Sequence, residues 1–378
     1  MTVGLAAVLA FCLALILLNL ASVGIALWRT WPRRRPYPTP APAPGVSIVR
    51  PLCGLDNFIE ETLSSSFTLD YPNYEVIFCV ARANDPVVGV ARRLIAQNPR
   101  IPAKLIIGDE KVSANPKLNN CVRGWDAAAH GLIALADHNV LMPKDYIQRM
   151  LAPFKPDVGL VCSMPLGSHP QNPWAELECA FLNTFEARWQ YAAAAAAGGF
   201  AQGKNMMWRK EVMERGGGVR ALAAEIAEDA ASTKLVHAQG LKVALVDSPF
   251  EQPLGRRSLR DVWMRQARWA RMRRKTFPLF YAPEIFAGAA VPAFAAAYAA
   301  HLADFGVAAA ALLVAALWHV PELVLAKIAG WHGSWRMPFM LALRDLMLPV
   351  MYLDAWFVDD FTWRGTQMSV REERSGAS

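Results

Sequence analysis

Residues 131–139, Gly-Leu-Ile-Ala-Leu-Ala-Asp-His-Asn, place an acidic residue directly after a short apolar run. A short uncharged run of this kind is typical of a buried β-strand. Asp137 would then follow the carboxyl end of that strand. In open α/β sheets, ligands bind outside the carboxyl ends of the strands. The stretch therefore predicts a strand and, directly after it, a binding position at Asp137.

Four more short apolar runs occupy residues 46–50, 75–80, 103–107 and 158–162. The segments between them are compatible with helices, and such alternation is typical of βαβ units. Strands of a parallel sheet are covered on both faces, so they read as continuous apolar runs. We predict an α/β domain with a mixed, mostly parallel sheet flanked by helices.

Residues 3–28 contain no charged side chain. As a helix rising about 1.5 Å per residue, they exceed the ~30 Å hydrocarbon core of a bilayer. A cleaved signal peptide is the alternative, but the segment lacks a basic beginning and is long for one. Arg29 and residues 33–35, also arginines, follow the helix. The positive-inside rule therefore predicts an N-terminus outside and the next residues in the cytosol.

The remaining chain divides by composition. Residues 29–45 form a basic, proline-rich linker, and residues 46–277 form the predicted cytosolic catalytic domain. Residues 278–360 form a C-terminal membrane region of two to three segments, and residues 361–378 a tail. Within the membrane region the apolar runs are residues 280–303, 307–326 and 338–358. Arg344 and Asp345 interrupt the third run, which leaves open whether it spans, enters or lies on the membrane.

The composition fits a membrane-bound enzyme. The chain has 378 residues, of which 54% are hydrophobic, and a formal net charge of +7; its mean hydropathy is +0.19. Its six cysteines form no CxxC pair, so we interpret them as small apolar residues in a reducing compartment. The basic balance fits an anionic membrane and a nucleotide sugar. No basic patch with interleaved aromatic residues predicts nucleic-acid binding.

Three polar positions are candidates for binding a phosphorylated donor. Asp137 is placed to hold Mg²⁺ or Mn²⁺ through oxygen, with phosphates and waters completing the coordination. Asp85 follows the second apolar run and is a candidate for binding the nucleoside; Lys117 is a candidate for phosphate or ribose oxygens. Each has a structural alternative: a turn or helix N-cap for the two aspartates, and a capped, solvated helix start for Lys117.

Two further groups are candidates for chemistry. Glu228 and Asp229 lie on a predicted helix, where a carboxylate within reach of an acceptor hydroxyl would serve as base; a solvated acidic pair is the alternative. Arg265 and Arg268 share a helix face beside Trp269, and guanidinium forks suit a diphosphate. The alternative is that this basic run, which continues to Lys275, rests on anionic lipid.

In order and spacing, these residues resemble the D, D, D, (Q/R)xxRW pattern of the ceramide glucosyltransferases, a branch of the GT-A glycosyltransferases. The matching motifs are Asp85-Pro86, Asn115-Pro116-Lys117 with Asn119-Asn120, Asp137, Ala227-Glu228-Asp229 and Arg265-x-x-Arg268-Trp269. Residues 49–56 and 69–72 also resemble this branch, and the likeness covers roughly residues 46–275.

The resemblance implies a GT-A fold and inverting transfer of a hexose, usually glucose from UDP-glucose, to the primary hydroxyl of a membrane lipid, with ceramide as leading acceptor. It implies that Asp85 contacts uridine, Asp137 the metal and diphosphate, and Asp229 the acceptor hydroxyl as base. Arg265, Arg268 and Trp269 would contact the diphosphate. Where many related transferases have a second acid, this chain has Asn139, so metal dependence would be weaker or involve His138.

Three alternative functions remain open at this stage. A transferase acting on a hopanoid or another lipid would keep the same catalytic residues. A polysaccharide synthase would use a similar (Q/R)xxRW motif but normally needs more membrane segments. A noncatalytic membrane scaffold would tolerate loss of Asp229 or Arg268. The aromatic segment 174–191 either lies at the membrane interface and admits the lipid or packs against the domain.

Overall fold

The computed structural model describes residues 3–32, 35–363 and 366–369. The chain forms two compact units. The α/β unit takes its described residues from Arg33–Ser168 and Ala193–Gly255; the helical unit takes them from Met1–Pro32, His169–Ala192 and Arg256–Ser378. The segment 46–277, predicted as the catalytic domain, thus contributes to both units. The predicted domain limits stay predictions.

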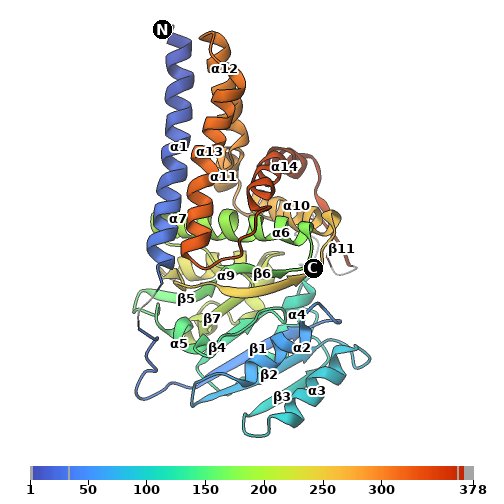
Figure 1. Ribbon diagram of the computed structural model, residues 1–378. Coiled ribbons are helices and arrows are strands. Elements are labelled where there is room, and N and C mark those ends of the chain that lie inside the picture. Colours follow the sequence, from blue (N-terminus) through green and yellow to red (C-terminus); the bar gives the residue numbers. More distant parts are fainter. Residues whose placement is uncertain (1–2, 33–34, 364–365, 370–378) are drawn as a thin grey trace. The chain divides into compact units, whose positions relative to one another are not determined.

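The α/β unit contains the mixed sheet that the apolar runs predict (Figure 1). Its strand order is β3-β2-β1-β4-β7-β5-β8. The strands are β1 (Val46–Leu52), β2 (Tyr74–Val80), β3 (Ala103–Ile107), β4 (Leu132–Ala136), β5 (Val158–Ser163), β7 (Asn205–Arg209) and β8 (Lys242–Leu245). Only β7 runs antiparallel to its neighbours, β4 and β5. The strand prediction for β1 to β5 is confirmed, whereas β7 and β8 were not predicted.

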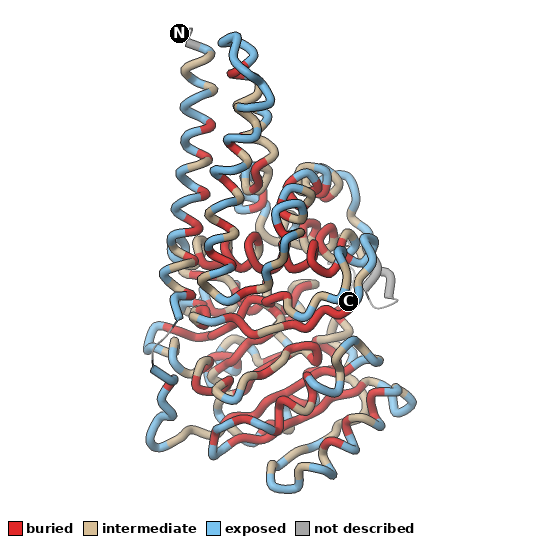
Figure 2. Tube along the Cα trace, viewed as in Figure 1, coloured by how far each residue is buried: buried red, intermediate tan, exposed pale blue. Residues whose placement is uncertain are grey.

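Helices and one small sheet complete this unit. β6 (Pro165–Pro170) pairs with β9 (Phe250–Gly255). The helices are α2 (Ile59–Ser64), η1 (Ser65–Phe67), α3 (Val87–Gln97), α4 (Pro116–Asp126), α5 (Tyr146–Leu151), α8 (Lys210–Arg215), η3 (Val219–Ala224) and α9 (Glu228–Ala238). Every residue of β1 and β2 is buried, as the red strands of Figure 2 show. Burial on both faces explains why these strands read as unbroken apolar runs.

The helical unit contains the candidate membrane segments. Its elements are α1 (Val3–Thr30), α6 (Pro173–Cys179), the π-helix η2 (Ala180–Ala187), α7 (Arg188–Ala197, which continues into the α/β unit), α10 (Leu259–Thr276), α11 (Pro278–Tyr281), η4 (Ala282–Phe286), α12 (Ala290–Leu302), α13 (Val307–Ile328), α14 (Met337–Phe357), β10 (Asp360–Trp363) and β11 (Thr366–Ser369).

Two of these helices are long and apolar enough to cross a membrane: Gly4–Thr30, with mean hydropathy 2.6, and Val307–Ile328, with mean hydropathy 1.9. The predicted run 280–303 is broken instead: Pro278–Phe286 and Ala290–Leu302 meet at a 45° bend and qualify only as a joined pair. The Asn19 side chain of α1 donates to the Trp318 carbonyl of α13, so these two helices pack together. The consecutive helices α12 and α13 pack against each other.

The third apolar run forms α14, which does not qualify as a candidate span among the described helices. Arg344 and Asp345, the charges that interrupt the run, are 0% and 2% exposed. They turn into the unit, while Leu346 and Val350 of the same helix are 67% and 55% exposed. On one face of the helix, the two charged side chains therefore pair with other protein groups. The apolar side chains occupy the other face.

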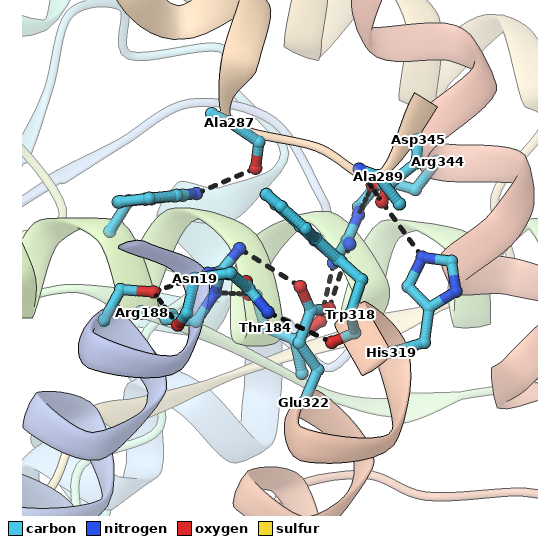
Figure 3. Close-up of polar contacts among 12 residues, drawn as sticks. Asn19, Thr184, Arg188, Ala287, Ala289, Trp318, His319, Glu322, Arg344 and Asp345 are labelled. Carbon is cyan, nitrogen blue, oxygen red and sulfur yellow. Dashed lines mark hydrogen bonds and ion pairs between the residues drawn. The ribbon is translucent and has the colours of Figure 1, made fainter. Parts of the chain in front are cut away.

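Those partners form a buried polar cluster in the helical unit (Figure 3). Glu322 of α13 accepts two guanidinium groups: Arg188 at 3.1 Å and Arg344 at 2.9 Å. Arg188 also donates to Asn19 Oδ1 of α1 at 2.6 Å. Arg344 continues to Asp345 Oδ1 at 2.7 Å. Two guanidinium groups thus face two carboxylates, His319 Nε2 of α13 lies 3.0 Å from Asp345 Oδ2, and the cluster joins α1, α7, α13 and α14.

The aromatic segment 174–191 is mostly packed inside the protein. Phe181, Phe185 and Tyr191 are 0%, 5% and 1% exposed, whereas Trp174 is 37% exposed. The Trp189 indole donates to the Ala287 carbonyl at 3.1 Å. Of the two alternatives for this segment, packing therefore describes most of its aromatic side chains.

We predict that Glu322→Gln lowers the free energy of unfolding by about 3–5 kcal/mol, because it leaves the buried Arg188 without its carboxylate partner and Arg344 with Asp345 alone. Unfolding of the purified protein in detergent, followed by tryptophan fluorescence, measures the loss. Asp157→Asn is the control: its ion pair with Lys242 has side chains 50% and 62% exposed, so its removal should cost under about 0.5 kcal/mol. Equal stability of the two variants would contradict the role given to Glu322.

Candidate active site

The loop after β4 carries Asp137, and hydrogen bonds from the Arg50 side chain hold the backbone of this loop. Arg50 lies in β1 and is fully buried. Its guanidinium donates to the backbone carbonyls of Asp137, His138 and Val140, each at 2.9 Å. A second nitrogen donates to the Ser66 hydroxyl at 2.6 Å. Because these bonds hold the backbone of the loop, the position of the Asp137 carboxylate follows from the packing of the sheet.

The Asp137 carboxylate lies between two lysines. Lys117 Nζ is 2.7 Å from its Oδ1, and Lys204 Nζ is 2.7 Å from its Oδ2. Lys117 comes from the first turn of α4, where Asn115 caps the helix by accepting from the backbone N–H groups of Lys117 and Leu118. Lys204 precedes β7, the antiparallel neighbour of β4. Helix cap and strand pairing thus bring both ammonium groups to one carboxylate.

Glu228 and Asp229, in the first turn of α9, complete the cluster. Glu228 Oε1 is 2.6 Å from Lys117 Nζ, and its Oε2 accepts from the Asn115 amide at 2.7 Å. Asp229 accepts from the backbone N–H groups of Gly203 and Ala230, both at 2.9 Å. Lys117 also donates to the Gly203 carbonyl. The three acids and two lysines therefore form one connected network.

The charges of this network shift its pKa values in different directions. Burial alone would raise the pKa of Asp137, but the charges of Lys117 and Lys204 outweigh it and hold that pKa well below its usual range. For Lys117, the carboxylates of Asp137 and Glu228 outweigh burial and raise the pKa. Burial, together with the charge of Glu228, raises the pKa of Asp229 to about 6. Asp229 is thus the group poised to exchange a proton near neutral pH.

Asp85 links the loops after β1 and β2. Its two carboxylate oxygens accept from the Gly54 backbone N–H, each at 3.0 Å, and Oδ1 also accepts from the Val87 N–H at 3.0 Å. The N-cap of α3 is Pro86, one residue later than the sequence suggested. Asp85 is partly exposed, so its structural role in the loop leaves it accessible. Its predicted contact with a nucleoside stays a prediction.

The arginine signature lies on α10 of the helical unit. This helix begins with a capping box in which Ser258 and Asp261 bond reciprocally. Arg265 pairs with the buried Glu178 of α6, and its guanidinium lies 5.9 Å from the centre of the Trp269 ring. Arg268 and Trp269 are partly exposed. Glu178 and the Trp269 ring therefore orient Arg265.

Of the seven predicted site residues, the structure brings Lys117, Asp137 and Asp229 into one network. Asp85 lies in the same unit, and Arg265, Arg268 and Trp269 lie in the helical unit. The sequence reading missed Lys204, Gly203 and the pairing of Asn115 with Glu228. The first two precede β7, a strand that the sequence pattern did not predict. The Asn115–Glu228 contact spans 113 residues, and no local pattern indicates it.

A divalent cation at this site would take few protein ligands, with Asp137 among them, although each oxygen of that carboxylate faces a lysine in this structure. No group of three His, Cys, Asp or Glu side chains suited to a metal occurs within residues 3–32, 35–363 and 366–369. Mg²⁺ commonly uses one or two carboxylates and completes its shell with phosphates and waters. The network has three carboxylates against two ammonium groups, so one negative charge is in excess when all are ionised. Asn139 Oδ1, two residues after Asp137, is buried without a hydrogen-bond partner in the described chain.

Because Gly203 has no side chain, its backbone can lie close to the carboxylates of Glu228 and Asp229. A Cβ at residue 203 would lie 2.8 Å from Glu228 Oε1 and 3.1 Å from Asp229 Oδ2. We predict that Gly203→Ala destabilises the protein by about 1–3 kcal/mol, the usual cost of overpacking. Gly131→Ala is the matched control, because a Cβ there meets nothing within 4 Å. Thermal unfolding of both variants tests this, and equal midpoints would contradict it.

Comparison with known proteins gives the fold and the relatives. A mannosyltransferase from Pyrobaculum calidifontis, solved with GDP-Man and Mn²⁺, is similar with a TM-score of 0.50 and 18% identity, over 90% of this chain and 97% of that one. The fold is that of GT-A glycosyltransferases. Ceramide glucosyltransferase 3 of Caenorhabditis elegans is 27% identical over 331 residues, 85% of this chain and 72% of the relative.

Two more relatives carry the same name. Ceramide glucosyltransferase 1 of Caenorhabditis elegans is 27% identical over 270 residues, 71% of this chain and 57% of the relative. The ceramide glucosyltransferase of Komagataella phaffii is 38% identical over 112 residues, 29% of this chain and 22% of the relative. The family model described as glycosyl transferase family 21 matches residues 14–375. Because this match covers nearly the whole chain, the protein belongs to glycosyl transferase family 21 and is a glycosyltransferase.

Proposed function

We propose that this protein transfers a hexose, with inversion, from a UDP-sugar to the primary hydroxyl of a membrane lipid, with UDP-glucose as donor and ceramide as acceptor. Membership of the family, with relatives named ceramide glucosyltransferase, supports sugar transfer to a lipid. The observation that carries the mechanism is Asp229: a carboxylate held by two backbone N–H groups, with a pKa raised to about 6, beside the Lys117–Asp137 pair.

In this proposal Asp229 acts as the base. The acceptor oxygen forms a bond to the anomeric carbon as the bond from that carbon to the diphosphate oxygen breaks. The electron pair of the broken bond leaves with UDP, and the hydroxyl proton passes to Asp229. One displacement without a covalent intermediate inverts the anomeric centre. The hydrogen bonds from Gly203 and Ala230 orient the carboxylate so that it can receive the proton.

The other residues bind the donor. Lys117 and Lys204 supply positive charge for the diphosphate, and Arg265, Arg268 and Trp269 are proposed to contact it as it leaves. Asp85 is proposed to contact uridine. Asp137 would hold Mg²⁺ or Mn²⁺, which supplies a Lewis acid for the departing diphosphate. The acidic network has one negative charge in excess when all its groups are ionised. The positive charge of a bound cation would therefore favour entry of the anionic donor.

The proposed location is a multi-pass membrane protein with its catalytic side in the cytosol. Two helices able to span a membrane support membrane attachment. The arginines after α1 support the cytosolic orientation by the positive-inside rule. A lipid acceptor stays in the bilayer, so an attached enzyme meets it in two dimensions.

The first test is transfer of labelled sugar from a panel of UDP-sugars into membrane lipid, with mass spectrometry of the product. We expect a β-linked glucosylceramide from wild type, and a loss of about 10²–10⁴-fold in kcat for Asp229→Asn. Asp157→Asn, on an exposed ion pair, should behave as wild type. Sugar on a hopanoid or another lipid would replace the acceptor; equal product from wild type and Asp229→Asn would remove Asp229 as the base.

The pKa of Asp229 predicts a pH profile. An aspartate with an ordinary pKa near 3.9 would stay ionised well below pH 5. Because the pKa of Asp229 is raised to about 6, the base form is present above that pH and is lost as pH falls through it. We expect kcat/KM to be level above about pH 7 and to fall about tenfold per pH unit below pH 6. A profile level down to pH 4.5 would exclude this group as the base.

Donor binding is expected to need the cation. Titration calorimetry with UDP should show affinity at least about tenfold higher in Mn²⁺ or Mg²⁺ than in EDTA, because the cation offsets charge at the diphosphate. In Asp137→Asn this difference should disappear. Equal UDP affinity in EDTA and in Mn²⁺ would show that Lys117 and Lys204 suffice and that the cation is not required.

A further inference from the structure

The basic run that ends α10 is compensated by acidic side chains of the same unit. The run consists of Arg271, Arg273, Arg274 and Lys275. Within the described chain, each of its three arginines pairs with a carboxylate. A run that rests on anionic lipid would instead offer these charges to the headgroups. The ion pairs therefore favour docking inside the protein over docking on lipid.

Arg271 ties α10 to the end of α14 and to the strand that follows it. Its Nη2 is 2.6 Å from Asp354 Oδ2, and the two side chains are 9% and 23% exposed. Its Nη1 donates to the backbone carbonyl of Asp360, in β10, at 2.7 Å. Removing one partner of a buried ion pair leaves an uncompensated charge and is strongly destabilising. The position of Arg271 therefore depends on Asp354.

Arg274 contacts the same segment of the chain. It pairs with Asp359 Oδ1, and the two side chains are 16% and 14% exposed. Its guanidinium also lies 5.6 Å from the centre of the Trp356 ring and donates to the Trp356 carbonyl at 3.4 Å. Because residues three apart share a helix face, Arg271 and Arg274 place one face of α10 on residues 354–360.

A second set of contacts holds the same part of α10 to other helices of the unit. Arg273 Nε is 2.9 Å from Glu284 Oε1 of η4, and its Nη1 is 3.3 Å from Glu186 Oε1 of η2. Ala270 is buried in one apolar cluster with Tyr281 of α11 and Ala355 of α14. The end of α10 is thus fixed by ion pairs and by an apolar contact.

The arginine signature lies on the same uninterrupted helix. Helix α10 (Leu259–Thr276) contains neither glycine nor proline, the residues at which helices usually kink. At about 1.5 Å per residue, Arg268 lies roughly 4.5 Å along the axis from Arg271, and Arg265 roughly 9 Å. The contacts at the end of α10 therefore also set where Arg265, Arg268 and Trp269 lie.

We propose that Asp354 and Asp359, which we call the acidic clamp, are positioning residues for the transfer. By pairing with Arg271 and Arg274, the acidic clamp holds α10 so that its arginine signature is in place. Functional groups must be held within about 0.5 Å of their productive positions. This inference rests on the proposed role of the signature at the diphosphate, and it adds the residues that orient the signature.

Neutralising the acidic clamp tests the proposal. In nanodiscs, with the UDP-sugar and lipid that give most product in the transfer panel, Asp354→Asn and Asp359→Asn should each lower kcat at least about tenfold, because a displacement of about 1 Å can lower a rate by 10²-fold. The KM for the UDP-sugar should stay within about twofold, since the signature is proposed to act as the diphosphate leaves. Asp304→Asn is the control: Asp304 is exposed in the same unit, and its kcat should match wild type.

The arginine partner decides between the acidic clamp and an anionic lipid surface. Arg271→Gln should lower kcat as Asp354→Asn does, and the double variant should lose no more than either single variant, because each change removes the same contact. The result should be the same in phosphatidylcholine nanodiscs with and without phosphatidylglycerol. If only Arg271→Gln lowers kcat, and only with phosphatidylglycerol present, the run binds anionic lipid and the acidic clamp is overturned. Single effects that multiply in the double variant would also overturn it.

Further variants separate positioning from stability and from the proposed function. Asp354→Glu keeps the carboxylate and should recover most of the wild-type kcat. Thermal unfolding gives the folded fraction of each variant, and a loss of activity that only follows this fraction would overturn the positioning role. Wild-type activity in Arg268→Ala would remove the signature from the proposed function. An inactive Arg268→Ala beside a fully active Asp354→Asn would overturn the acidic clamp alone.

Discussion

The contact of Lys117 with Asp137 and Glu228 is the interaction on which the candidate site depends. One ammonium group lies within 2.7 Å of one carboxylate and 2.6 Å of the other, and those carboxylates follow β4 and begin α9. Without it, two buried anions would repel each other across the edge of the sheet. Together with Lys204, it holds the pKa of Asp137 well below its usual range, whereas burial and the charge of Glu228 raise the pKa of Asp229 to about 6. The two acids therefore differ because two lysines pair with Asp137, whereas burial dominates at Asp229.

The two units differ in how their buried charged groups are paired. The pairing in the helical unit is suited to a structural role, and the pairing in the α/β unit is suited to a chemical one. In the helical unit, Arg188 and Arg344 face Glu322 and Asp345, and His319 is a further partner of Asp345. These buried groups pair with one another and join the helices. In the α/β unit the network has one carboxylate in excess. An incompletely compensated cluster at the carboxyl ends of strands is where a cationic or proton-exchanging function is expected.

The sequence predicts the parts of this protein that local pattern encodes. The strands β1 to β5 follow from continuous apolar runs, and Asp137 follows from its place after one of them. Lys204 was missed because its partner is 67 residues away and β7 reaches β4 by an antiparallel pairing that no local pattern specifies. The break between η4 and α12 was missed because composition alone does not reveal a bend. The partners of Arg344 could not be predicted, since burial of a charge depends on side chains from distant helices.

Helix α10 positions the arginine that the proposed function assigns to the diphosphate. Its residues Arg265 and Trp269 are four apart and share one helix face, and the Arg265 guanidinium lies 5.9 Å from the centre of the Trp269 ring. Arg265 also pairs with Glu178 of α6, whose side chain is 1% exposed. An arginine held in this way by a buried carboxylate and a ring is oriented before any ligand binds, and such fixed positive charge is suited to a departing diphosphate.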